Sequence, residues 1–443
     1  MLKKYLLSFV LLLSIFSVRA EKVKVRIYSA SKIAQAVLSF DVGRYVIRDA
    51  SGKIISDTLD LNRSVEVKVS GGKVWVSANA YELGTYDKIS LTSVDSTCLF
   101  CINPTGKKQR TYEGDIYIKV LKNNSLEFVT EVDFETYIAG VVQSEIYGKP
   151  DQTDIFRVQA IISRTWALRN QNKHKADGFN FCDDVHCQAY YNRCIRPEIV
   201  FGTLQSVGEI LVDKNGKPID TPFHSNSGGQ TANSEDVWSA KIPYLRSVPD
   251  TFSYRMKQSV WKRELTKSEW LGYFAKKHKI NTADTAICNE LLNFTQDERK
   301  ARIMNIPLTR IRTDFKLKST FFSVTTNGNK VTLEGRGYGH GVGLSQEGTI
   351  RMVALGYKYQ EILSHYYQGA IIYRDMNLVE PKYQTYADEI QKIIANDKKV
   401  EAVQSNKNSK GLEKLFSKKE REEREEVYVE EEQDNDAEWD YEW

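Results

Sequence analysis

The segment VDFETYIAGVVQSEI, residues 132–146, predicts an amphipathic helix that carries an acid at the edge of its apolar face. Asp133 is a favourable N-cap residue, and the apolar side chains that follow recur at helical spacing. The apolar row consists of Phe134, Tyr137, Ile138, Val141 and Val142. One further turn along the same face places Glu145 beside this row.

A carboxylate in the position expected for Glu145 loses solvation, and the loss raises its pKa. A glutamic acid with such a pKa can serve as a general acid near neutral pH. The alternative is a structural glutamate that pairs with a lysine or arginine at the edge of the helix. The helix taken by itself leaves both interpretations open.

Residues 153–173, TDIFRVQAIISRTWALRNQNK, predict a second amphipathic helix, capped by Thr153 or Asp154. Its apolar side is formed by Ile155, Val158, Ile161, Ile162, Thr165 and Leu168. Two adjacent helices, one of which carries an acid, can form the wall of a cleft. Arg164 could face Glu145 across that cleft, and a solvated Arg164 is the competing expectation.

Four metal-ligating side chains fall within fourteen residues: His174, Cys182, His186 and Cys187. Two sulfurs and two imidazoles form a suitable ligand set for tetrahedral zinc. A disulfide between Cys187 and either Cys182 or Cys194 is the alternative, because disulfides are common outside the cytoplasm. The spacing leaves both open. Zinc held by four protein ligands would be structural, since no coordination position remains for water.

The first twenty residues predict a signal peptide. Two lysines precede an apolar run from Tyr5 to Val18, and Val-Arg-Ala offers a cleavage site after Ala20. The run is shorter than the ~20 residues of a membrane-spanning helix. We therefore expect an exported protein of the periplasm or cell envelope, with no transmembrane segment after signal removal.

The charge of the chain is unevenly distributed. The whole chain carries +4, of which −11 lies in residues 420–443 and +3 in residues 1–20, so that +12 remains for residues 21–419. A basic body favours anionic polymers, which outside the cytoplasm include cell-wall glycan. No nucleic-acid motif is present, and we expect no nucleic-acid partner.

Residues 21–130 predict a β-rich region of short strands, among them residues 23–30, 36–42, 45–49 and 64–70. Residues 117–132 predict a hairpin that turns at Asn123-Asn124. Cys98 and Cys101 form a C-x2-C pair, for which a local disulfide and half of a metal site remain equally open.

Two polar segments further along predict loops that line a site. Residues 221–238, TPFHSNSGGQTANSEDVW, lack helical periodicity, and no G-x-S-x-G motif supports a serine hydrolase. Five glycines in residues 335–343 leave the backbone bare around His340, which allows another chain to approach closely. No nucleotide-binding motif follows these glycines.

Residues 262–300 predict an outer helical segment, and Asn327-Gly328 predicts a hairpin turn.

Five segments, in this order, resemble the stage II sporulation protein D (SpoIID/LytB) family. They are VDFETYIAGVVQSEI, QAIISRTWAL, CDDVHCQAYY, HSNSGGQTANSEDVW with IPYLRSV, and GRGYGHGVGLSQEGTIRMVALGYKYQEILSHYYQG. The resemblance covers about residues 130–375 and implies a peptidoglycan lytic transglycosylase, also named an amidase enhancer. It places the catalytic glutamate at Glu145. It also places a zinc group at His174, Cys182, His186 and Cys187, which favours structural zinc over a disulfide.

The implied chemistry needs one carboxylate, and no second carboxylate of these segments competes with Glu145. We expect the glycan to contact Arg164, Gln188, Ser225, Ser227, Gly228, Gly229, His340, Ser345 and Gln346. Whether the stem peptides must be removed from the glycan first stays open. The competing hypotheses are a non-catalytic glycan-binding module that recruits or activates a cell-wall amidase, and a zinc hydrolase with an open coordination position.

The expected fold is α+β. A β-rich region (21–130) precedes a mixed helix and strand catalytic core with a substrate groove (131–375). Residues 376–443 are rich in charge runs and predict a disordered tail outside the family pattern.

Overall fold

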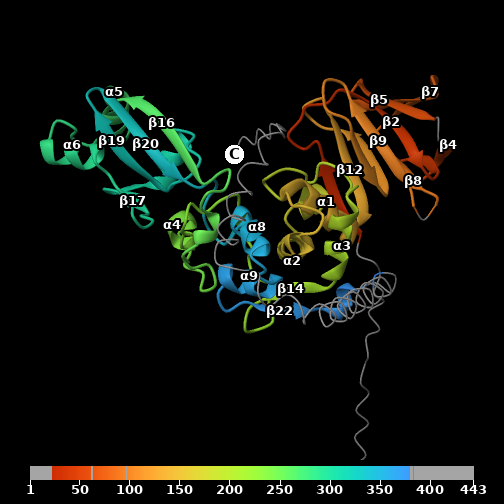
Figure 1. Cartoon of the computed structure of the whole chain (residues 1–443). Coiled ribbons are helices and arrows are strands. Elements are labelled where there is room, and N and C mark those ends of the chain that lie inside the picture. The colour runs from red at the N-terminus through yellow and green to blue at the C-terminus, as the bar shows by residue number, and fades with distance from the viewer. Residues whose placement is uncertain (1–21, 61–62, 96, 380–382, 384–443) are drawn as a thin grey trace, which may run out of the picture. The chain divides into compact units, whose positions relative to one another are not determined.

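The computed structural model describes residues 22–60, 63–95, 97–379 and 383, and it shows the expected α+β fold (Figure 1). The predicted signal peptide and nearly all of the predicted tail lie outside these residues. Within the described ranges, no helix has both the length and the apolar character needed to cross a membrane.

The N-terminal region is built from strands, as predicted. They are β1 (Lys22–Ile27), β2 (Gln35–Val42), β3 (Tyr45–Asp49), β4 (Ile54–Leu59), β5 (Ser64–Ser70), β6 (Lys73–Ala78), β7 (Tyr81–Tyr86), β8 (Lys88–Ser93), β9 (Leu99–Pro104), β10 (Arg110–Glu113), β11 (Asp115–Val120) and β12 (Leu126–Asp133). The hairpin predicted at Asn123-Asn124 joins β11 to β12, and Asn124 adopts a positive φ of 60° in its turn.

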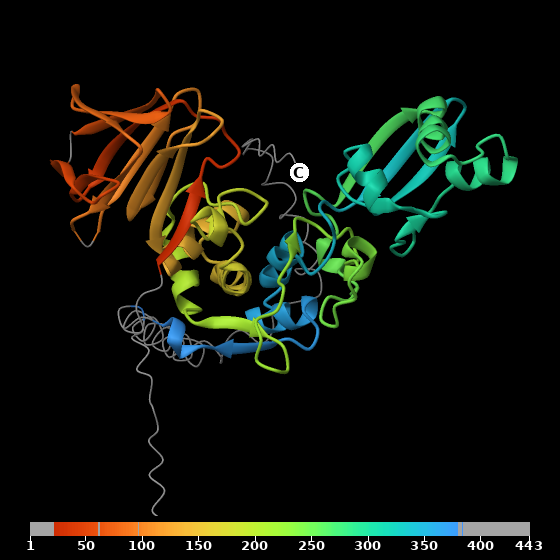
Figure 2. The same cartoon turned by 180° about the vertical axis from the view of Figure 1, so that it is seen from behind.

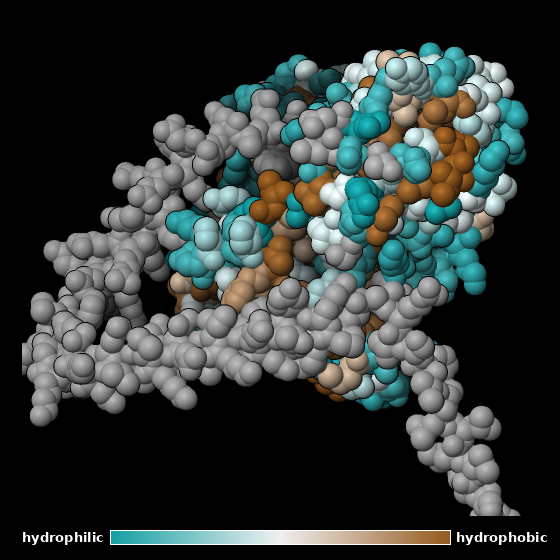
Figure 3. Space-filling view, turned by 90° about the vertical axis from the view of Figure 1, so that its right-hand side faces the viewer, coloured by the Kyte–Doolittle hydropathy of each residue, from teal (hydrophilic) through white to brown (hydrophobic). Residues whose placement is uncertain are grey.

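These strands form two sheets that share one apolar core. One sheet has the order β13-β1-β12-β11-β8-β3-β4, in which β13 (Phe181–Cys182) pairs in parallel with β1; the other has the order β10-β9-β2-β5-β6-β7. Alternate residues such as Val65 and Val67 of one sheet and Ile116 and Ile118 of the other are buried together. This alternation is typical of a β-sandwich. In the space-filling view of Figure 3, apolar patches on the surface are interrupted by polar residues.

Three helices follow the sandwich: α1 (Phe134–Glu145), α2 (Thr153–Asn170) and, after the loop that contains β13, α3 (Pro197–Gln205). Asp133 caps α1, as predicted, by accepting the backbone N–H groups of Glu135 and Thr136. The apolar row of α1 is buried in the same core as the strands.

The cap predicted for α2 is wrong. The helix begins at Thr153, so Gln152 takes the N-cap position and makes no side-chain capping bond. The predicted apolar side of α2 is buried except for the half-buried Leu168.

A second apolar core joins α2 to the C-terminal elements, and it includes Val158, Ile162, Leu344, Met352 and Ile362. The elements are β14 (Glu209–Val212), β15 (Phe223–His224), α4 (Ser234–Trp238), β21 (Leu344–Ser345), α8 (Gln346–Ala354), α9 (Tyr359–Tyr366) and β22 (Ile371–Arg374). Three short 3-10 helices lie at Lys175–Asp177, Thr251–Ser253 and Met376–Leu378. Strands β15 and β21 pair in parallel, and this pairing brings the two loop segments predicted from the sequence side by side.

A third core belongs to an insertion between those two loops. It comprises β16 (Val260–Thr266), α5 (Lys267–His278), α6 (Thr285–Leu292), β17 (Arg302–Ile303), β18 (Ile306–Pro307), α7 (Leu308–Asp314), β19 (Phe322–Asn327) and β20 (Lys330–Arg336). Both cartoon views show these elements as a group (Figures 1 and 2). The hairpin predicted at Asn327-Gly328 is confirmed. The helical prediction holds for α5 and α6 but is wrong for residues 262–266, which pair with β20.

Candidate active site

Glu145 is the last residue of α1, and its half-buried side chain makes no ion pair within the described part of the chain. Its Oε1 accepts the backbone N–H of Ala189 at 2.6 Å, and its backbone carbonyl accepts Nε2 of Gln346 at 2.8 Å. The end of α1, the loop after β13 and the start of α8 therefore meet at this residue. The alternative of a structural ion pair with lysine or arginine does not hold.

Desolvation raises the pKa of Glu145 to about 7, and the negative charge of Asp184 adds to the shift. The hydrogen bond from Ala189 opposes the shift, because it stabilises the charged form. The carboxyl group is thus protonated in a large fraction of molecules at neutral pH. This is the state that a general acid requires.

Asp184 is a second carboxylate near Glu145, and its position was not predictable from the sequence. Asp184 is half-buried, and its negative charge raises the pKa of Glu145. The neighbouring Asp183 turns away and binds the sandwich instead. Two adjacent aspartates in an irregular loop carry no periodicity from which their directions could be predicted. The order of residues in the segment CDDVHC was the only available signal.

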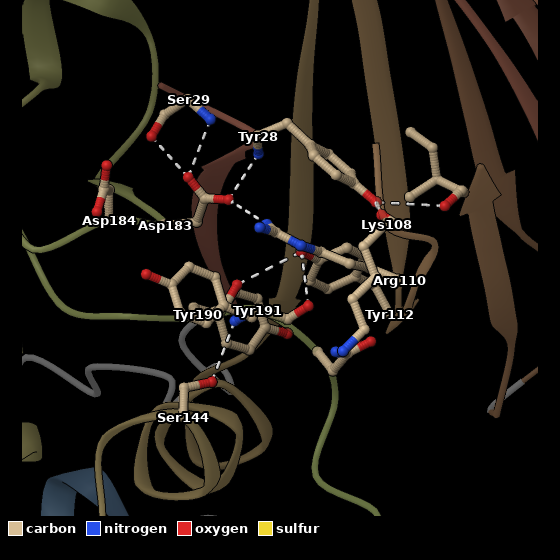
Figure 4. Close-up of polar contacts among 12 residues, drawn as sticks. Tyr28, Ser29, Lys108, Arg110, Tyr112, Ser144, Asp183, Asp184, Tyr190 and Tyr191 are labelled. Carbon is tan, nitrogen blue, oxygen red and sulfur yellow. Dashed lines mark hydrogen bonds and ion pairs between the residues drawn. The ribbon is translucent and has the colours of Figure 1, made fainter. Parts of the chain in front are cut away.

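The loop that carries Ala189 is fastened to the β-sandwich by Asp183 (Figure 4). Its carboxylate accepts the backbone N–H groups of Tyr28 at 2.6 Å and Ser29 at 2.9 Å, and Nη1 of Arg110 at 2.7 Å. The Arg110 guanidinium lies 4.3 Å from the ring centroid of Tyr28 and 4.7 Å from that of Tyr191.

The same loop is also fastened to α1, because the Tyr191 N–H donates to the Ser144 hydroxyl at 3.1 Å. Ser144 directly precedes Glu145 in the chain. The donor at Ala189 is therefore held in place from both sides. A donor fixed in advance costs no reorganisation when charge develops on its acceptor.

The predicted metal ligands lie together in the same loop. The ligand atoms of His174, Cys182, His186 and Cys187 all lie within 4.8 Å of one another. Cys182 Sγ lies 3.6 Å from His186 Nδ1, and Cys187 Sγ lies 3.4 Å from His174 Nε2. A tetrahedral centre with arms of about 2.0–2.3 Å has edges of about 3.3–3.8 Å, so this group fits a tetrahedral metal ion.

The disulfide alternatives do not hold, because all six cysteines carry free thiols. This applies to the Cys98 and Cys101 pair as well as to Cys182, Cys187 and Cys194. A hydrogen bond from Cys187 lowers the pKa of Cys182, which favours the thiolate that a metal ion requires.

Arg164 was predicted either to face Glu145 or to be solvated, and the structure shows neither. Its side chain is fully buried, and its Nε and Nη2 donate to the two carboxylate oxygens of Glu135 at 2.8 and 2.7 Å. It is neither solvated nor directed at Glu145. Because the pair lies in the interior between α1 and α2, the predicted contact between Arg164 and the substrate is wrong.

Several other predicted glycan contacts form the interior of the site. Gln188, Ser227, Gly228, Gly229 and Ser345 are buried. The Ser227 hydroxyl donates to the buried Asp250 at 2.7 Å, and Ser345 caps α8 through the N–H of Gly348. Their burial contradicts the predicted contact with substrate, because the side chains of Gln188, Ser227 and Ser345 and the backbone N–H groups of the two glycines bond within the protein.

Ser225, His340 and Gln346 remain half-buried and reach the surface. The ring centroid of His340 lies 5.4 Å from that of His224 and 5.0 Å from that of Trp238. Desolvation and the positive charge of Arg312 lower the pKa of His340 to about 3, so its imidazole is neutral at physiological pH.

The close approach predicted at the glycine-rich loop is present, but the approaching chain belongs to the protein itself. A Cβ at Gly337 would lie 2.5 Å from the carbonyl oxygen of Asn226, and one at Gly343 would lie 2.2 Å from that of Pro222. Both glycines have positive φ, at 76° and 71°. The glycines therefore seat residues 222–228 against the loop that carries His340.

Comparison with known proteins agrees with this arrangement. The family described as SpoIID, stage II sporulation protein, matches residues 122–205, which include Glu145 and the four candidate metal ligands. Stage II sporulation protein D of Bacillus amyloliquefaciens is 27% identical over 289 residues, which cover 60% of this chain and 81% of that protein. Its counterpart in Bacillus subtilis (strain 168) is 28% identical over 290 residues, which cover 61% of this chain and 82% of that protein.

A more distant similarity is found to the amidase enhancer of Bacillus subtilis (strain 168). It is 24% identical over 273 residues, which cover 49% of this chain and 38% of that protein. The two kinds of relative carry both names that the sequence resemblance implied. The chain is thus similar to proteins of the SpoIID family, and the family model itself matches residues 122–205.

Proposed function

We propose that the protein is a peptidoglycan lytic transglycosylase in which Glu145 is both general acid and general base. The observation that supports this most is the half-buried, unpaired carboxyl group whose pKa is raised to about 7. Similarity to the SpoIID family and to an amidase enhancer supports a role at the cell wall. The predicted signal peptide agrees with a location in the cell envelope.

The reaction needs a single proton carrier. Glu145 protonates the β-1,4 glycosidic oxygen between N-acetylmuramic acid and N-acetylglucosamine, and the bond from that oxygen to muramic C1 breaks. The resulting carboxylate then takes the proton of the muramic C6 hydroxyl, whose oxygen closes onto C1 as the 1,6-anhydro product. A hydrolase would need a second carboxylate to attack C1 or to activate water.

We expect the two carboxyl oxygens to have different tasks. Oε1 accepts the Ala189 N–H, so Oε2 is the oxygen that carries the proton. The Ala189 bond strengthens as Glu145 becomes charged, and it stabilises the carboxylate between the two proton transfers. Ser225, His340 and Gln346 are the side chains that we expect to contact the glycan.

We also propose that His174, Cys182, His186 and Cys187 hold a zinc ion. Four protein ligands close the coordination sphere, so zinc supplies structure and no activated water. Ala189 follows Cys187 by two residues, and the ion would therefore fix the loop that delivers the Ala189 N–H to Glu145. A zinc hydrolase would require an open position, which four ligands do not leave.

Purified protein should contain one zinc ion per chain by elemental mass spectrometry. Cys182→Ser and Cys187→Ser should lose that zinc and unfold at a lower temperature, because a structural zinc site contributes directly to folding. Cys194→Ser is the matched control, because Cys194 is a buried free thiol outside the group and should keep the metal. Equal zinc content in all three variants would contradict the assignment.

Cleavage should depend on pH through Glu145. Above a pH of about 7 the rate should fall tenfold per pH unit, because the proton needed for the first step is lost. Asp184→Asn should move this fall to lower pH, since the negative charge of Asp184 raises the pKa of Glu145. The measurement is the initial rate on purified glycan strands between pH 5 and 9. A profile unchanged by Asp184→Asn would contradict this electrostatic coupling.

The name of one relative, amidase enhancer, favours a second candidate function. In that case the protein binds glycan and recruits or activates a cell-wall amidase without cleaving the strand. Glu145→Gln would then leave the stimulation of an added amidase unchanged, and neither variant nor wild type would shorten the strands. Strand shortening that requires Glu145 excludes this candidate.

A further inference from the structure

Three arginines gather beside the loop that carries His340. The guanidinium carbons of Arg299 and Arg336 lie 4.7 and 3.9 Å from the ring centroid of Phe321. A Cβ on Gly341 would lie 2.9 Å from the guanidinium carbon and both terminal nitrogens of Arg299. The Arg299 guanidinium therefore lies against the backbone one residue after His340.

Arg312, on α7, lies near the same loop. Its Nε donates to the carbonyl oxygens of Leu317 and Lys318, each at 3.3 Å. The Lys318 carbonyl also accepts the N–H of Gly339, at 2.9 Å. The shared acceptor places the Arg312 guanidinium beside the residue that precedes His340.

The terminal nitrogens of Arg312 are not used by the described part of the protein. Across the described ranges, neither Nη1 nor Nη2 has a hydrogen-bond partner, although the side chain is half-buried. A guanidinium carries four N–H donors on these two nitrogens. These nitrogens are not among the buried polar atoms without a partner, so they stay open to solvent and to a ligand. A ligand that accepts from them gains the affinity of a hydrogen bond to a charged group.

No carboxylate of the described residues forms an ion pair with this group. Among the described residues, no ion pair includes Arg299, Arg312 or Arg336. In contrast, two other buried or half-buried arginines near the active site have a carboxylate partner. Arg110 pairs with Asp183, and Arg164 pairs with Glu135.

The electrostatics of the three arginines favour the binding of an anion. Desolvation, together with the charges of Arg336 and Arg312, lowers the pKa of Arg299 to about 9, and desolvation lowers that of Arg312. A bound anion would offset both effects.

We propose that the free Nη1/Nη2 edge of Arg312, beside His340, binds a carboxylate of the glycan substrate. This inference rests on the proposed function, because it takes peptidoglycan as the ligand. The flat guanidinium edge matches the two oxygens of a carboxylate in a bidentate contact. N-acetylmuramic acid offers such a group as its lactyl carboxylate when the stem peptide is absent, and the stem peptide offers its own carboxylates when present.

The site is within reach of a strand bound at Glu145. Gln346, which donates to the Glu145 carbonyl, follows His340 by six residues. Six extended residues span at most about 20 Å. A glycan strand that occupies the active site and continues along this segment therefore reaches Arg312.

Strand binding by Arg312→Gln tests the proposal. Arg310→Gln is the matched control, because Arg310 lies on the same helix, is exposed, and pairs with Asp314 at 3.2 Å. Both changes are made in a Glu145→Gln background, so that strands are not consumed. Three ligands are compared by titration calorimetry: peptide-free strands, the same strands with lactyl carboxylates converted to amides, and strands with intact stem peptides.

The proposal expects peptide-free strands to bind roughly 10- to 100-fold more tightly than amidated strands, the range typical of a charged hydrogen-bonded contact. Arg312→Gln should remove that difference, and Arg310→Gln should keep it. Arg312→Lys, which retains the charge but not the bidentate edge, should recover part of it and serves if the glutamine variant fails to fold. An Arg312-dependent preference for peptide-bearing strands would support the site and assign the carboxylate to the peptide.

Equal affinities in the Arg312 and Arg310 variants for all three ligands would overturn the proposal. Strand cleavage by the protein with native Glu145, together with such equal affinities, would leave the proposed function standing. Arg312-dependent binding without any cleavage would have the opposite meaning, since the site would then serve a glycan-binding module.

Discussion

Glu145→Gln should lower the rate of strand cleavage by about 10²–10⁴-fold, the usual contribution of a general acid and base. The amide keeps the shape of the side chain but has no proton to give to the glycosidic oxygen. Binding of strands should be retained. Initial rates and strand affinity, measured on the same preparation, test both parts.

Misfolding would not explain such a loss. The pKa of Glu145 in the folded protein lies above its ordinary value, so the folded state binds more protons than the unfolded chain between pH 4.5 and 7. Stability is lost as pH rises through this window, and a neutral glutamine avoids the loss. The variant should thus be more stable than wild type at pH 8, by on the order of 1–3 kcal/mol.

Glu290→Gln, the same chemical change on the exposed side of α6, is the control and should leave cleavage unchanged. Full activity of Glu145→Gln would rule out Glu145 as the proton carrier.

Arg164→Met should lower the free energy of unfolding by about 3–5 kcal/mol, because it leaves the Glu135 carboxylate buried without its partner. The guanidinium also donates to the Glu209 carbonyl at 3.0 Å, and that acceptor would be left unsatisfied as well. Urea denaturation followed by circular dichroism measures the effect.

Arg169→Met provides the comparison on the same helix. Its pair with Asp220 is about 40% exposed, so its loss should cost less than 1 kcal/mol. Similar losses for the two variants would show that the Arg164 pair is not the buried link between α1 and α2 that its geometry indicates.

Features that depend on local sequence were predictable. The cap and apolar row of α1 involve residues within one helix, and both are confirmed. The same row indicated the desolvation of Glu145. The β-strands and two hairpin turns were predictable for the same reason, since alternation and turn residues act over a few positions.

Contacts between distant segments were not predictable. Ala189 lies 44 residues after Glu145, and Glu135 lies 29 residues before Arg164. Neither pairing leaves a periodic signal. Residues 260–266 were missed as a strand because most of their side chains are exposed, so apolar alternation is weak there.

The glycines of residues 335–343 predict where a chain approaches closely, but not which chain it is. Alternating glycines correctly indicated a close approach at residues 335–343, but a bare backbone does not identify what approaches it. The protein's own residues 222–228 fill that position. As a consequence, Ser227, Gly228 and Gly229 are buried within the protein, and we do not expect them to contact a glycan.

The most direct test of the account is mass spectrometry of purified glycan strands after incubation with the mature protein and with Glu145→Gln. Strands with and without stem peptides are compared, so that any peptide requirement is measured at the same time. The account predicts 1,6-anhydro-muramic ends from wild type only. Reducing ends would contradict it, because they would show hydrolysis and direct attention to Asp184 as a second carboxylate.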